Sequence, residues 1–481
     1  MRHTVRPSIA YVSAQLPSYL AAEHRVVERS IAALQSQAAA LGFDLVHAWQ
    51  PVSTRAEAEA VAAEATAGGV DMVLLQCSSF AMGDVVAPFG RGPYRLGLWA
   101  VEEPQRSGPI PLNGFVAMHL HAGILTTAAE GPRRPYKWFF GLGDHPWFAP
   151  RLAVTVAALR ATRALRGARI GFVGGVAPSF WSLAVDERTL RRRLGAEVIT
   201  RDLGDVVERA RAADERDVDR TLAAMRDAVR GVSAPDDDLR CSAAVYLALR
   251  DLAIEDGCDA LAVSDWPQFQ EALGIHPGAA FSWLDEADGV PVAAEGDVLG
   301  ALTMRFANVL AQGPAMLLDM NDVDLEADAI MMWHCGGSPL AFADDDGARW
   351  DVHTTLGRKQ PGAVPRGAVA DLRFRHGPTT MLRLRDDGGE LFVMGAEVVP
   401  HPTPGFDGSR GWVGRFADAD GRRSAADVVQ TVLTHGVEHH LVLADGAVAP
   451  AAREAAAWLG MSLTPTVTYR DELATPREVG P

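Results

Sequence analysis

Cysteine is scarce in this chain of 481 residues. The four cysteines, Cys77, Cys241, Cys258 and Cys335, form no Cys-x-x-Cys pair, which argues against a zinc finger or a dithiol redox motif. So few thiols in so long a chain are typical of a protein from a reducing compartment.

The sequence also lacks a net positive charge and long apolar runs. Lys and Arg number 45 and Asp and Glu number 61, so the formal net charge is −16 at pH 7. A negative field disfavours nucleic acids and anionic membranes as partners. No apolar stretch reaches the roughly 20 residues that a membrane span needs, and MRHTVRPSIAYVSAQLP lacks the apolar segment of a signal peptide. We therefore expect a cytoplasmic protein that binds neither nucleic acid nor membrane.

The common phosphate-binding and esterase motifs are missing as well. Neither a P-loop nor a G-x-S-x-G elbow occurs, so ATP hydrolysis and serine esterase chemistry have no support. Gly171, Gly174 and Gly175 follow a strand-like stretch, but Pro178 interrupts the helix that a dinucleotide fingerprint requires. We interpret these glycines as a tight turn.

What the chain does have is the composition of a folded protein with several domains. Hydrophobic residues make up 48 % and charged residues 22 % of the sequence, close to soluble globular averages. At about 150 residues per domain, the length predicts three domains, each able to bury its own core.

Two segments, 1–165 and 166–325, alternate strand and helix signals. The expected strands cover 8–16, 43–49, 71–78, 94–102, 197–203 and 260–266, with a further strand and glycine-rich turn at 168–182. The expected helices cover 24–42, 56–69 and 151–166. Strands separated by helices of this length indicate crossover units and parallel sheets.

After about residue 325 the pattern changes to short alternating strands. Residues 370–399 contain HGP and DDGG turns that are typical of antiparallel hairpins. A further strand is expected at 439–446 and a helix at 449–460. We therefore predict an α/β protein with two Rossmann-like α/β domains on parallel sheets, followed by a β-rich, barrel-like domain over 326–481.

Two carboxylates follow an expected strand in VPVAAEGDVLGAL. Asp297 has the position of a helix N-cap, whose carboxylate accepts hydrogen bonds from helix amides. Glu295 lies where α/β sheets place ligand-binding residues, although an ordinary surface carboxylate has the same pattern.

Asp319 and His334 each terminate an apolar run, AMLL and AIMMW respectively. Each can therefore point into a cleft, although a histidine so placed is also commonly a hydrogen-bonded core residue. The acidic stretch between them fits a solvated loop. His439 and His440 precede LVLADG, and because adjacent strand residues face opposite sides, we expect only one of them to join a given site.

These four stretches together offer carboxylate oxygens and imidazole nitrogens without a thiolate. Such a ligand set suits Mn²⁺, Mg²⁺, Co²⁺ or Fe²⁺ better than structural zinc. Cys335 adjoins His334 in the sequence, and we assign it to packing.

At these residues the chain resembles the L-fucose isomerase/L-arabinose isomerase family. The segment ending in VPVAAEGDVLGALT resembles the family's Glu-Gly-Asp segment, which makes Glu295 the first metal-binding carboxylate. MLLDMNDV resembles the segment of the second carboxylate, Asp319, with the Asp of fucose isomerases rather than the Glu of arabinose isomerases. MMWHCGG and GVEHHLVL resemble arabinose-type histidine segments, which favours His334 and His440 as metal ligands and His439 as a substrate contact.

The resemblance implies an aldose–ketose isomerase of carbohydrate metabolism with a divalent metal, usually Mn²⁺. It implies a cis-enediol(ate) intermediate, with Glu295 and Asp319 as the proton-transfer pair. It also implies a homotrimer or homohexamer whose active sites are shared between subunits. Substrate contacts are then expected from the loop and helix that carry Glu102, Asn113 and His119, although loop and cap roles would use the same residues.

Several alternatives stay open at the level of sequence. Another metal-dependent sugar enzyme, an aldolase or an epimerase, would use the same site, and a non-catalytic sugar-binding protein would also fit two α/β domains. The sugar is not specified, and a phosphorylated or sulfonated substrate is compatible with the cations Arg133, Arg134 and Lys137.

Overall fold

The structure, a computed structural model, describes residues 5–127, 135–353, 357 and 362–475. It is a mixed α/β fold with two parallel sheets and a larger mixed sheet. The described residues up to Arg163 form one compact unit, here called the N-terminal unit, and those from Ala164 onward form the C-terminal unit. The predicted division of the later residues into two domains at residue 325 stays a prediction. Among the described helices, none is long and apolar enough to cross a membrane.

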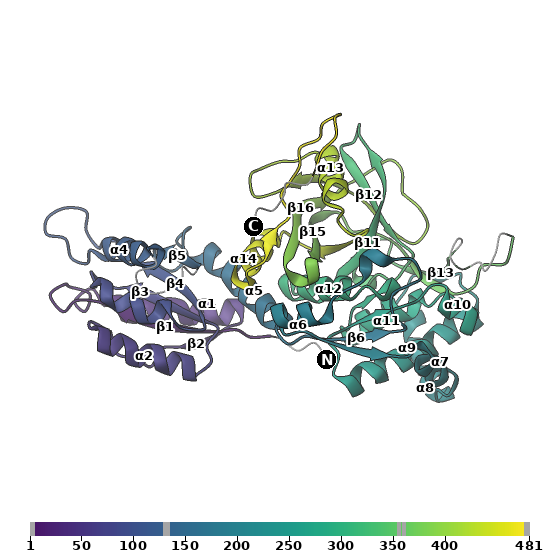
Figure 1. The fold of residues 1–481 in the computed structure, drawn as a ribbon, viewed down its shortest axis with the longest axis horizontal. Coiled ribbons are helices and arrows are strands. Elements are labelled where there is room, and N and C mark those ends of the chain that lie inside the picture. The colour runs from purple at the N-terminus through teal and green to yellow at the C-terminus, as the bar shows by residue number, and fades with distance from the viewer. Residues whose placement is uncertain (1–4, 128–134, 354–356, 358–361, 476–481) are drawn as a thin grey trace. The chain divides into compact units, whose positions relative to one another are not determined.

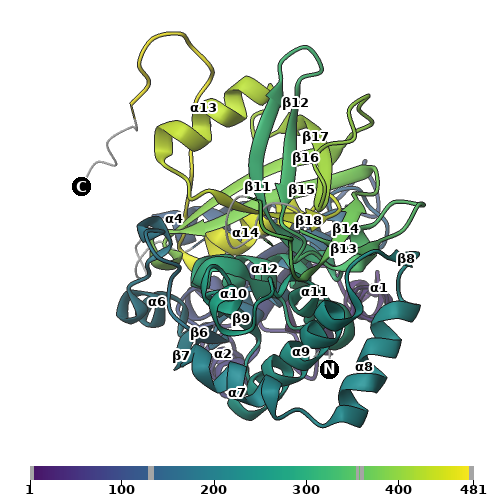
Figure 2. The ribbon, with the colours of Figure 1, turned by 90° about the vertical axis from the view of Figure 1, so that its right-hand side faces the viewer.

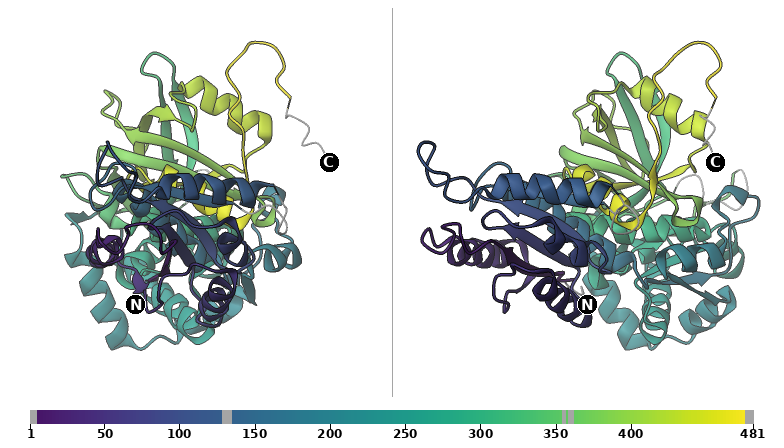
Figure 3. Two further views of the ribbon diagram at one scale, coloured as in Figure 1. Left: turned by 90° about the vertical axis from the view of Figure 1, so that its left-hand side faces the viewer. Right: turned by 60° about the vertical axis from the view of Figure 1, so that its left-hand side comes forward.

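The N-terminal unit contains a five-stranded parallel sheet with the strand order β2-β1-β3-β4-β5 and helices on both faces (Figures 1 and 3). Its strands are β1 (Ser8–Ala14), β2 (Asp44–Val46), β3 (Met72–Cys77), β4 (Arg95–Ala100) and β5 (Tyr136–Phe140). Its helices are α1 (Val26–Leu41), α2 (Arg55–Ala67), α3 (Val86–Gly90), α4 (Gly114–Thr126) and α5 (Ala149–Leu165), the last of which contains the boundary between the units.

Local sequence accounts for most of these elements. β3 is buried along its whole length, as its run of apolar residues predicts. Gly42 ends α1 in the left-handed conformation with φ 73°, as predicted. α2 begins with a capping box: the Thr54 side chain accepts a hydrogen bond from the Glu57 N–H, and the Glu57 side chain accepts one from the Thr54 N–H.

The C-terminal unit begins with a four-stranded parallel sheet in the order β10-β9-β6-β7. Its strands are β6 (Arg169–Val173), β7 (Glu197–Arg201), β9 (Ala260–Val263) and β10 (Val292–Ala293). The accompanying helices are α6 (Glu187–Leu194), α7 (Leu203–Arg211), α8 (Glu215–Asp227), α9 (Asp236–Asp256), α10 (Gln268–Ala272), α11 (Gly278–Asp288) and α12 (Val298–Ala311). The glycine-rich segment after β6 is a turn without a following long helix, as interpreted from Pro178.

The mixed sheet has ten strands, six of which close into a ring. These six are β11 (Ala315–Asp324), β12 (Ala329–His334), β15 (Gly377–Arg385), β16 (Glu390–Val398), β17 (Ser409–Ala417) and β18 (His440–Asp445). Every neighbouring pair around the ring is antiparallel, and the pairing of β16 with β17 closes it. The remaining elements are β8 (Gly231–Val232), β13 (Arg349–Val352), β14 (Ala368–Arg373), β19 (Ser462–Leu463), α13 (Ala425–His435) and α14 (Ala449–Leu459). Figure 2 shows the ring beside the parallel sheet of the same unit.

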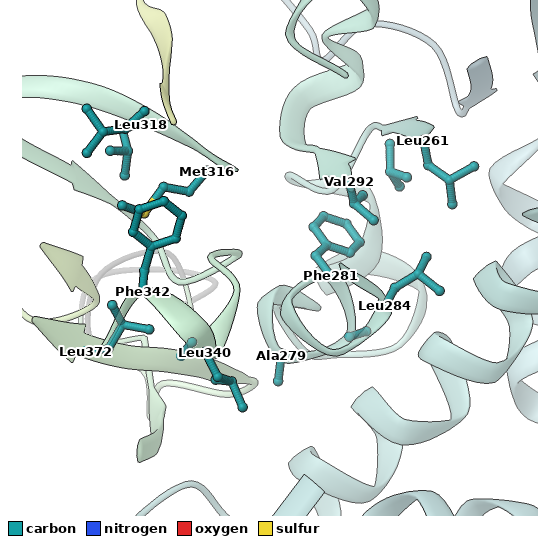
Figure 4. Packing of buried hydrophobic residues seen from close by; sticks show 14 of the residues in the cluster. Leu261, Ala279, Phe281, Leu284, Val292, Met316, Leu318, Leu340, Phe342 and Leu372 are labelled. Atoms are coloured by element: carbon teal, nitrogen blue, oxygen red, sulfur yellow. The ribbon is translucent and has the colours of Figure 1, made fainter. Parts of the chain in front are cut away.

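One apolar core joins the parallel sheet to the ring within the C-terminal unit. Figure 4 shows its two sides, with Phe281 and Leu284 of α11 near Val292 and Leu261 on one side, and Met316 and Leu318 of β11 on the other. Helix α12 contacts β9 and β10 as well as β11, β15 and β18. The N-terminus of α12 is therefore held between the two sheets, and this is where the candidate site forms.

The structure corrects two details of the predicted strands. The DDGG turn joins β15 to β16 as a hairpin, but the HGP segment does not, because β14 pairs with β13 and β17 rather than with β15. β11 extends to Asp324, so the acidic stretch after Asp319 is strand rather than loop, and Asp319 lies inside the strand. The antiparallel partner β12 supplies the backbone hydrogen bonds that extend it.

Candidate active site

Glu295 projects from a tight turn between β10 and α12. Its backbone is left-handed, with φ 60° and ψ 15°, a conformation that costs a non-glycine residue about 1–2 kcal/mol. Both of its backbone groups are engaged, because its N–H donates to Asp265 Oδ1 at 2.7 Å and its carbonyl accepts from the Ala177 N–H at 3.0 Å. The direction of the Glu295 side chain is thus set by its surroundings.

The Glu295 carboxylate meets both neighbouring histidines. Its Oε2 lies 3.1 Å from His439 Nε2 and 3.5 Å from His440 Nε2. The expectation that only one of the two histidines would reach the site is wrong, because β18 begins at His440 and His439 lies before the strand pairing starts. His439 is partly exposed and its ring also packs at 5.4 Å from the Phe180 ring.

Asp297 is the N-cap of α12, as predicted, and its carboxylate does more than cap. Oδ1 accepts from the Gly300 N–H at 2.7 Å, while Oδ2 lies 2.9 Å from His440 Nδ1. The Arg383 guanidinium of β15 binds both oxygens, at 2.5 and 3.0 Å. All three side chains are buried. Removing one partner of a fully buried charge pair strongly destabilises the folded protein, because the other charge stays buried without compensation.

The charges around Asp297 affect both the pKa and the orientation of the His440 ring. Burial raises the pKa of Asp297, but Arg383 and His440 lower it by more, and the net pKa lies well below its usual range. Burial is the largest single influence and lowers the pKa of His440, but the hydrogen bond to Asp297 and the negative charges of Asp297, Asp319 and Glu295 together raise it by more. The Asp297 carboxylate accepts a hydrogen bond from His440 Nδ1–H, and this orients the ring so that Nε2 points at Glu295. This is the arrangement in which a metal-binding histidine is normally oriented by a carboxylate.

Asp319 lies directly opposite His440 in the register of β11 and β18. Its Oδ1 is buried and has no hydrogen-bond partner among the described residues. Burial is the main cause of the raised pKa of Asp319, and the nearby Glu295 charge adds to it. A buried carboxylate oxygen without a donor is costly, and a cation is one partner that would satisfy it.

His334 ends β12, as predicted, and its ring lies 5.8 Å from the His440 ring, centre to centre. Its Nδ1 is 3.5 Å from the Cys335 sulfur. Burial, followed by the charge of His440, lowers the pKa of His334 to about 3. A neutral imidazole at ordinary pH is the form that binds a metal.

These residues fit a divalent cation. Glu295, His439 and His440 offer ligand atoms within 4.8 Å of one another, and both Asp319 and His334 adjoin His440. The metal-ligand and catalytic roles of Glu295 and Asp319, and the ligand roles of His334 and His440, stay predictions.

The expected substrate contacts Glu102, Asn113 and His119 belong to the N-terminal unit. Glu102 follows β4, and Asn113 precedes α4 in the left-handed conformation with φ 56°. His119 is exposed on α4. Their contacts with a sugar stay predictions.

Of the cations considered for an anionic substrate, Arg133 and Arg134 lie outside the described residues. Lys137 donates to the Arg151 carbonyl at 2.9 Å. The proposal of an anion contact there stays open.

Three residues around the site were missed at the level of sequence. Asp265 follows β9 and so carries the same strand-end signal that indicated Glu295. His276 lies in a loop and Arg383 in the middle of β15, and neither position carries a local signal. Arg383 alternates with apolar residues as a solvent-facing strand residue would, yet it is fully buried against Asp297.

The chain is similar to curated sugar isomerases. "Sulfoquinovose isomerase" of Alkalicoccus urumqiensis is 28 % identical over 392 residues, 80 % of this chain and 83 % of that protein. The protein of the same name from Priestia aryabhattai is 26 % identical over 384 residues, 78 % of this chain and 81 % of its own. No family model matches the chain.

A likeness to solved structures is too weak to define a shared fold. A periplasmic solute-binding protein from Actinobacillus succinogenes with bound D-allose is 12 % identical over 59 % of this chain and 83 % of its own, with a TM-score of 0.17. The curated relatives, by contrast, span four-fifths of the chain. They support an enzyme that interconverts an aldose and a ketose, which sets aside the alternative of a non-catalytic sugar-binding protein.

Proposed function

We propose that this isomerase acts on sulfoquinovose, a sulfonated aldose, and forms the corresponding 2-ketose through a cis-enediolate with a divalent cation in the site. The observation that carries the proposal is the convergence of Glu295, His439 and His440 on one point, beside the unpartnered oxygen of Asp319. The name shared by the Alkalicoccus and Priestia relatives, sulfoquinovose isomerase, supports the choice of sugar.

Glu295, Asp319, His334 and His440 would hold the cation. Carboxylate oxygens and imidazole nitrogens suit Mn²⁺, the metal that the resemblance to fucose and arabinose isomerases implies. When bound there, a divalent cation would supply positive charge that acidifies the C2 proton of the open-chain sugar and offsets the charge that develops on its oxygens.

Glu295 and Asp319 are the proposed proton-transfer pair. Both carboxylates adjoin His440, one from the turn before α12 and the other from β11. Two carboxylates that flank C1 and C2 can remove the proton from one carbon and deliver it to the other. His439, which reaches Glu295 and remains partly exposed, is the proposed contact for a sugar hydroxyl.

The proposed assembly is a homotrimer or homohexamer in which Glu102, Asn113 and His119 of a neighbouring subunit contact the sugar. Solution scattering should show a trimer or a larger assembly. A fully active monomer would contradict the shared site and leave the proposed metal site intact.

A substrate screen tests the proposed reaction. The metal-free protein is reloaded with Mn²⁺ and incubated with sulfoquinovose, glucose 6-phosphate, L-fucose and L-arabinose, and the products are identified by NMR. We expect a 2-ketose from sulfoquinovose with all carbons retained. Cleavage products would indicate an aldolase, and an aldose of altered configuration would indicate an epimerase. Turnover of only the unsulfonated sugars would overturn the proposed substrate.

The same reaction in D₂O tests the enediolate. A proton-transfer mechanism in which the carboxylates exchange with solvent incorporates deuterium at C1 of the ketose and at C2 of the recovered aldose. A hydride shift between the two carbons would leave both positions unlabelled and would contradict the roles of Glu295 and Asp319.

A further inference from the structure

A second group of metal-ligating side chains is buried behind Glu295. Asp265, His276 and Cys335 offer ligand atoms within 4.8 Å of one another, and all three residues are buried. His276 Nε2 lies 3.5 Å from Asp265 Oδ2 and 3.6 Å from the Cys335 sulfur. Such a set has the composition of a zinc site, so its hydrogen bonds decide between a metal site and a polar network.

The tautomer of His276 argues against a metal in this group. The Gly278 N–H donates to His276 Nδ1 at 3.2 Å, and a neutral ring nitrogen that accepts a hydrogen bond carries no proton. The proton is therefore on Nε2, the atom that faces Asp265. A metal on Nε2 would move this proton to Nδ1, where it would meet the Gly278 N–H.

Asp265 is thus left with two donors, one for each carboxylate oxygen. Oδ1 accepts the Glu295 N–H at 2.7 Å, a short distance typical of a hydrogen bond to a charged acceptor. Oδ2 faces the protonated Nε2 of His276 at 3.5 Å. Burial raises the pKa of Asp265, but the contacts with His276 and the Glu295 N–H lower it by more.

We propose that Asp265 is a positioning residue, which holds Glu295 in its left-handed conformation through the Glu295 N–H and is itself oriented by His276. The inference rests on the proposed function, because it assigns the purpose of this network to the aim of the Glu295 carboxylate. A left-handed non-glycine residue persists only where its surroundings over-determine it. Without the Asp265 contact the Glu295 turn relaxes, and the carboxylate leaves His439 and His440.

The substitution Asp265→Asn tests this arrangement with almost no change in volume. The amide has one acceptor and one donor group, so in either orientation its NH₂ faces the Glu295 N–H or the His276 Nε2–H. A change of His276 tautomer does not help, because Nδ1 already accepts from Gly278. We expect Asp265→Asn to weaken Mn²⁺ binding, measured with the metal alone, by about 10–100-fold, as is typical when an outer partner of a metal ligand is removed.

Kinetics separate positioning from general structural damage. At saturating Mn²⁺, Asp265→Asn should lower kcat by about 10–100-fold in the parent. In a Glu295→Gln background the same change should lower kcat by less than about threefold, because Asp265 acts through Glu295. An equal loss in both backgrounds would show that Asp265 has only a structural role.

Asp427→Asn is a matched control from outside the site. Like the Asp265 carboxylate, its carboxylate has a donor at each oxygen, here the backbone N–H groups of Ser424 at 2.9 Å and Tyr469 at 2.8 Å. This variant should keep the Mn²⁺ affinity and kcat of the parent. If Asp265→Asn fails to fold, His276→Gln leaves the Asp265–Glu295 bond in place, and a smaller loss with the same dependence on Glu295 is expected.

A crystal structure of Asp265→Asn tests the proposal independently of activity. In this variant the proposal requires Glu295 to leave the left-handed region, and an unchanged backbone at Glu295 would overturn it. If Asp265→Asn does not fold, a crystal structure of His276→Gln should show a displaced Asp265 carboxylate, and an Asp265 side chain in its parent position would overturn the orienting role of His276. A parent enzyme that isomerises no sugar would overturn the proposed function instead, since the conformation of Glu295 is measured without substrate.

Discussion

Glu295 and Asp297 are two positions apart and equally acidic, yet the structure gives them different surroundings. Glu295 lies among ligand-type atoms and remains partly accessible, whereas Asp297 is fully buried between Arg383 and His440. Glu295→Gln should therefore lower kcat by at least about 10²-fold at saturating metal, with little change in the free energy of unfolding. Steady-state kinetics and urea unfolding of the same preparations check both parts.

Asp297→Asn should lower the free energy of unfolding more strongly than it lowers kcat. Asn caps a helix nearly as well as Asp, but the amide leaves the buried Arg383 without its charged partner. Breaking a buried pair costs about 3–5 kcal/mol, so urea unfolding should show a loss of this size in the C-terminal unit. The same change loosens His440, so metal affinity should also fall.

The control for Asp297 is Asp186→Asn, which alters another helix cap without a buried partner. The Asp186 side chain accepts from the Arg188 and Thr189 amides at the start of α6. Its replacement should leave stability nearly unchanged. A mild effect at Asp297 equal to that at Asp186 would mean that capping is the whole role of Asp297.

At the scale of elements, the turn between β10 and α12 depends on Gly296. Its φ is 72°, and a Cβ there would lie 2.1 Å from the Gly175 carbonyl oxygen. Gly296→Ala should therefore displace the segment after β6 together with Glu295, and reduce Mn²⁺ affinity more than tenfold in a titration.

Gly175 is the matched control for this turn. It has a similar φ of 80°, but a Cβ there would meet nothing within 4 Å. Gly175→Ala should carry only the strain of the left-handed conformation, about 1–2 kcal/mol, and keep the metal affinity. Equal metal affinities in the two variants would contradict the importance of the close approach.

How far the sequence predicts the elements depends on how local their causes are. The buried strands β1, β3 and β9 follow from their own apolar residues, and α1 and α12 from their glycine and aspartate caps. β11 could not be delimited in this way, because its acidic end is kept in the strand by pairing with β12. The HGP segment has turn residues, but the partners of β14 and β15 are chosen by distant strands.

The residues of the candidate site also differ in whether a local sequence signal indicates them. The strand-end rule indicated Glu295 and His334 because it depends only on the end of an apolar run. It could not indicate Arg383, which pairs with Asp297 across 86 positions of sequence. Nor could it show that His439 and His440 both reach Glu295, since this depends on where β18 begins.

At the scale of the whole molecule, buried histidines make the C-terminal unit sensitive to acid. Burial is the main cause that lowers the pKa of both His334 and His353 to about 3. Below about pH 6.5, the usual pKa of histidine, the unfolded chain binds a proton at each position and the folded chain does not. Stability contributed by the neutral histidines is therefore present above this pH and is lost as the pH falls toward about 3.

His353→Gln isolates one of these contributions without touching a proposed ligand. Each such histidine adds at most about 1.4 kcal/mol per pH unit to the slope of stability against pH. The free energy of unfolding of the metal-free protein, measured in urea at pH 7, 6, 5 and 4, should fall less steeply in the variant. The raised pKa of His440 acts in the opposite direction, but it is common to both proteins and cancels in the comparison. Parallel pH profiles would show that His353 is protonated in the folded state and that its burial does not oppose charging.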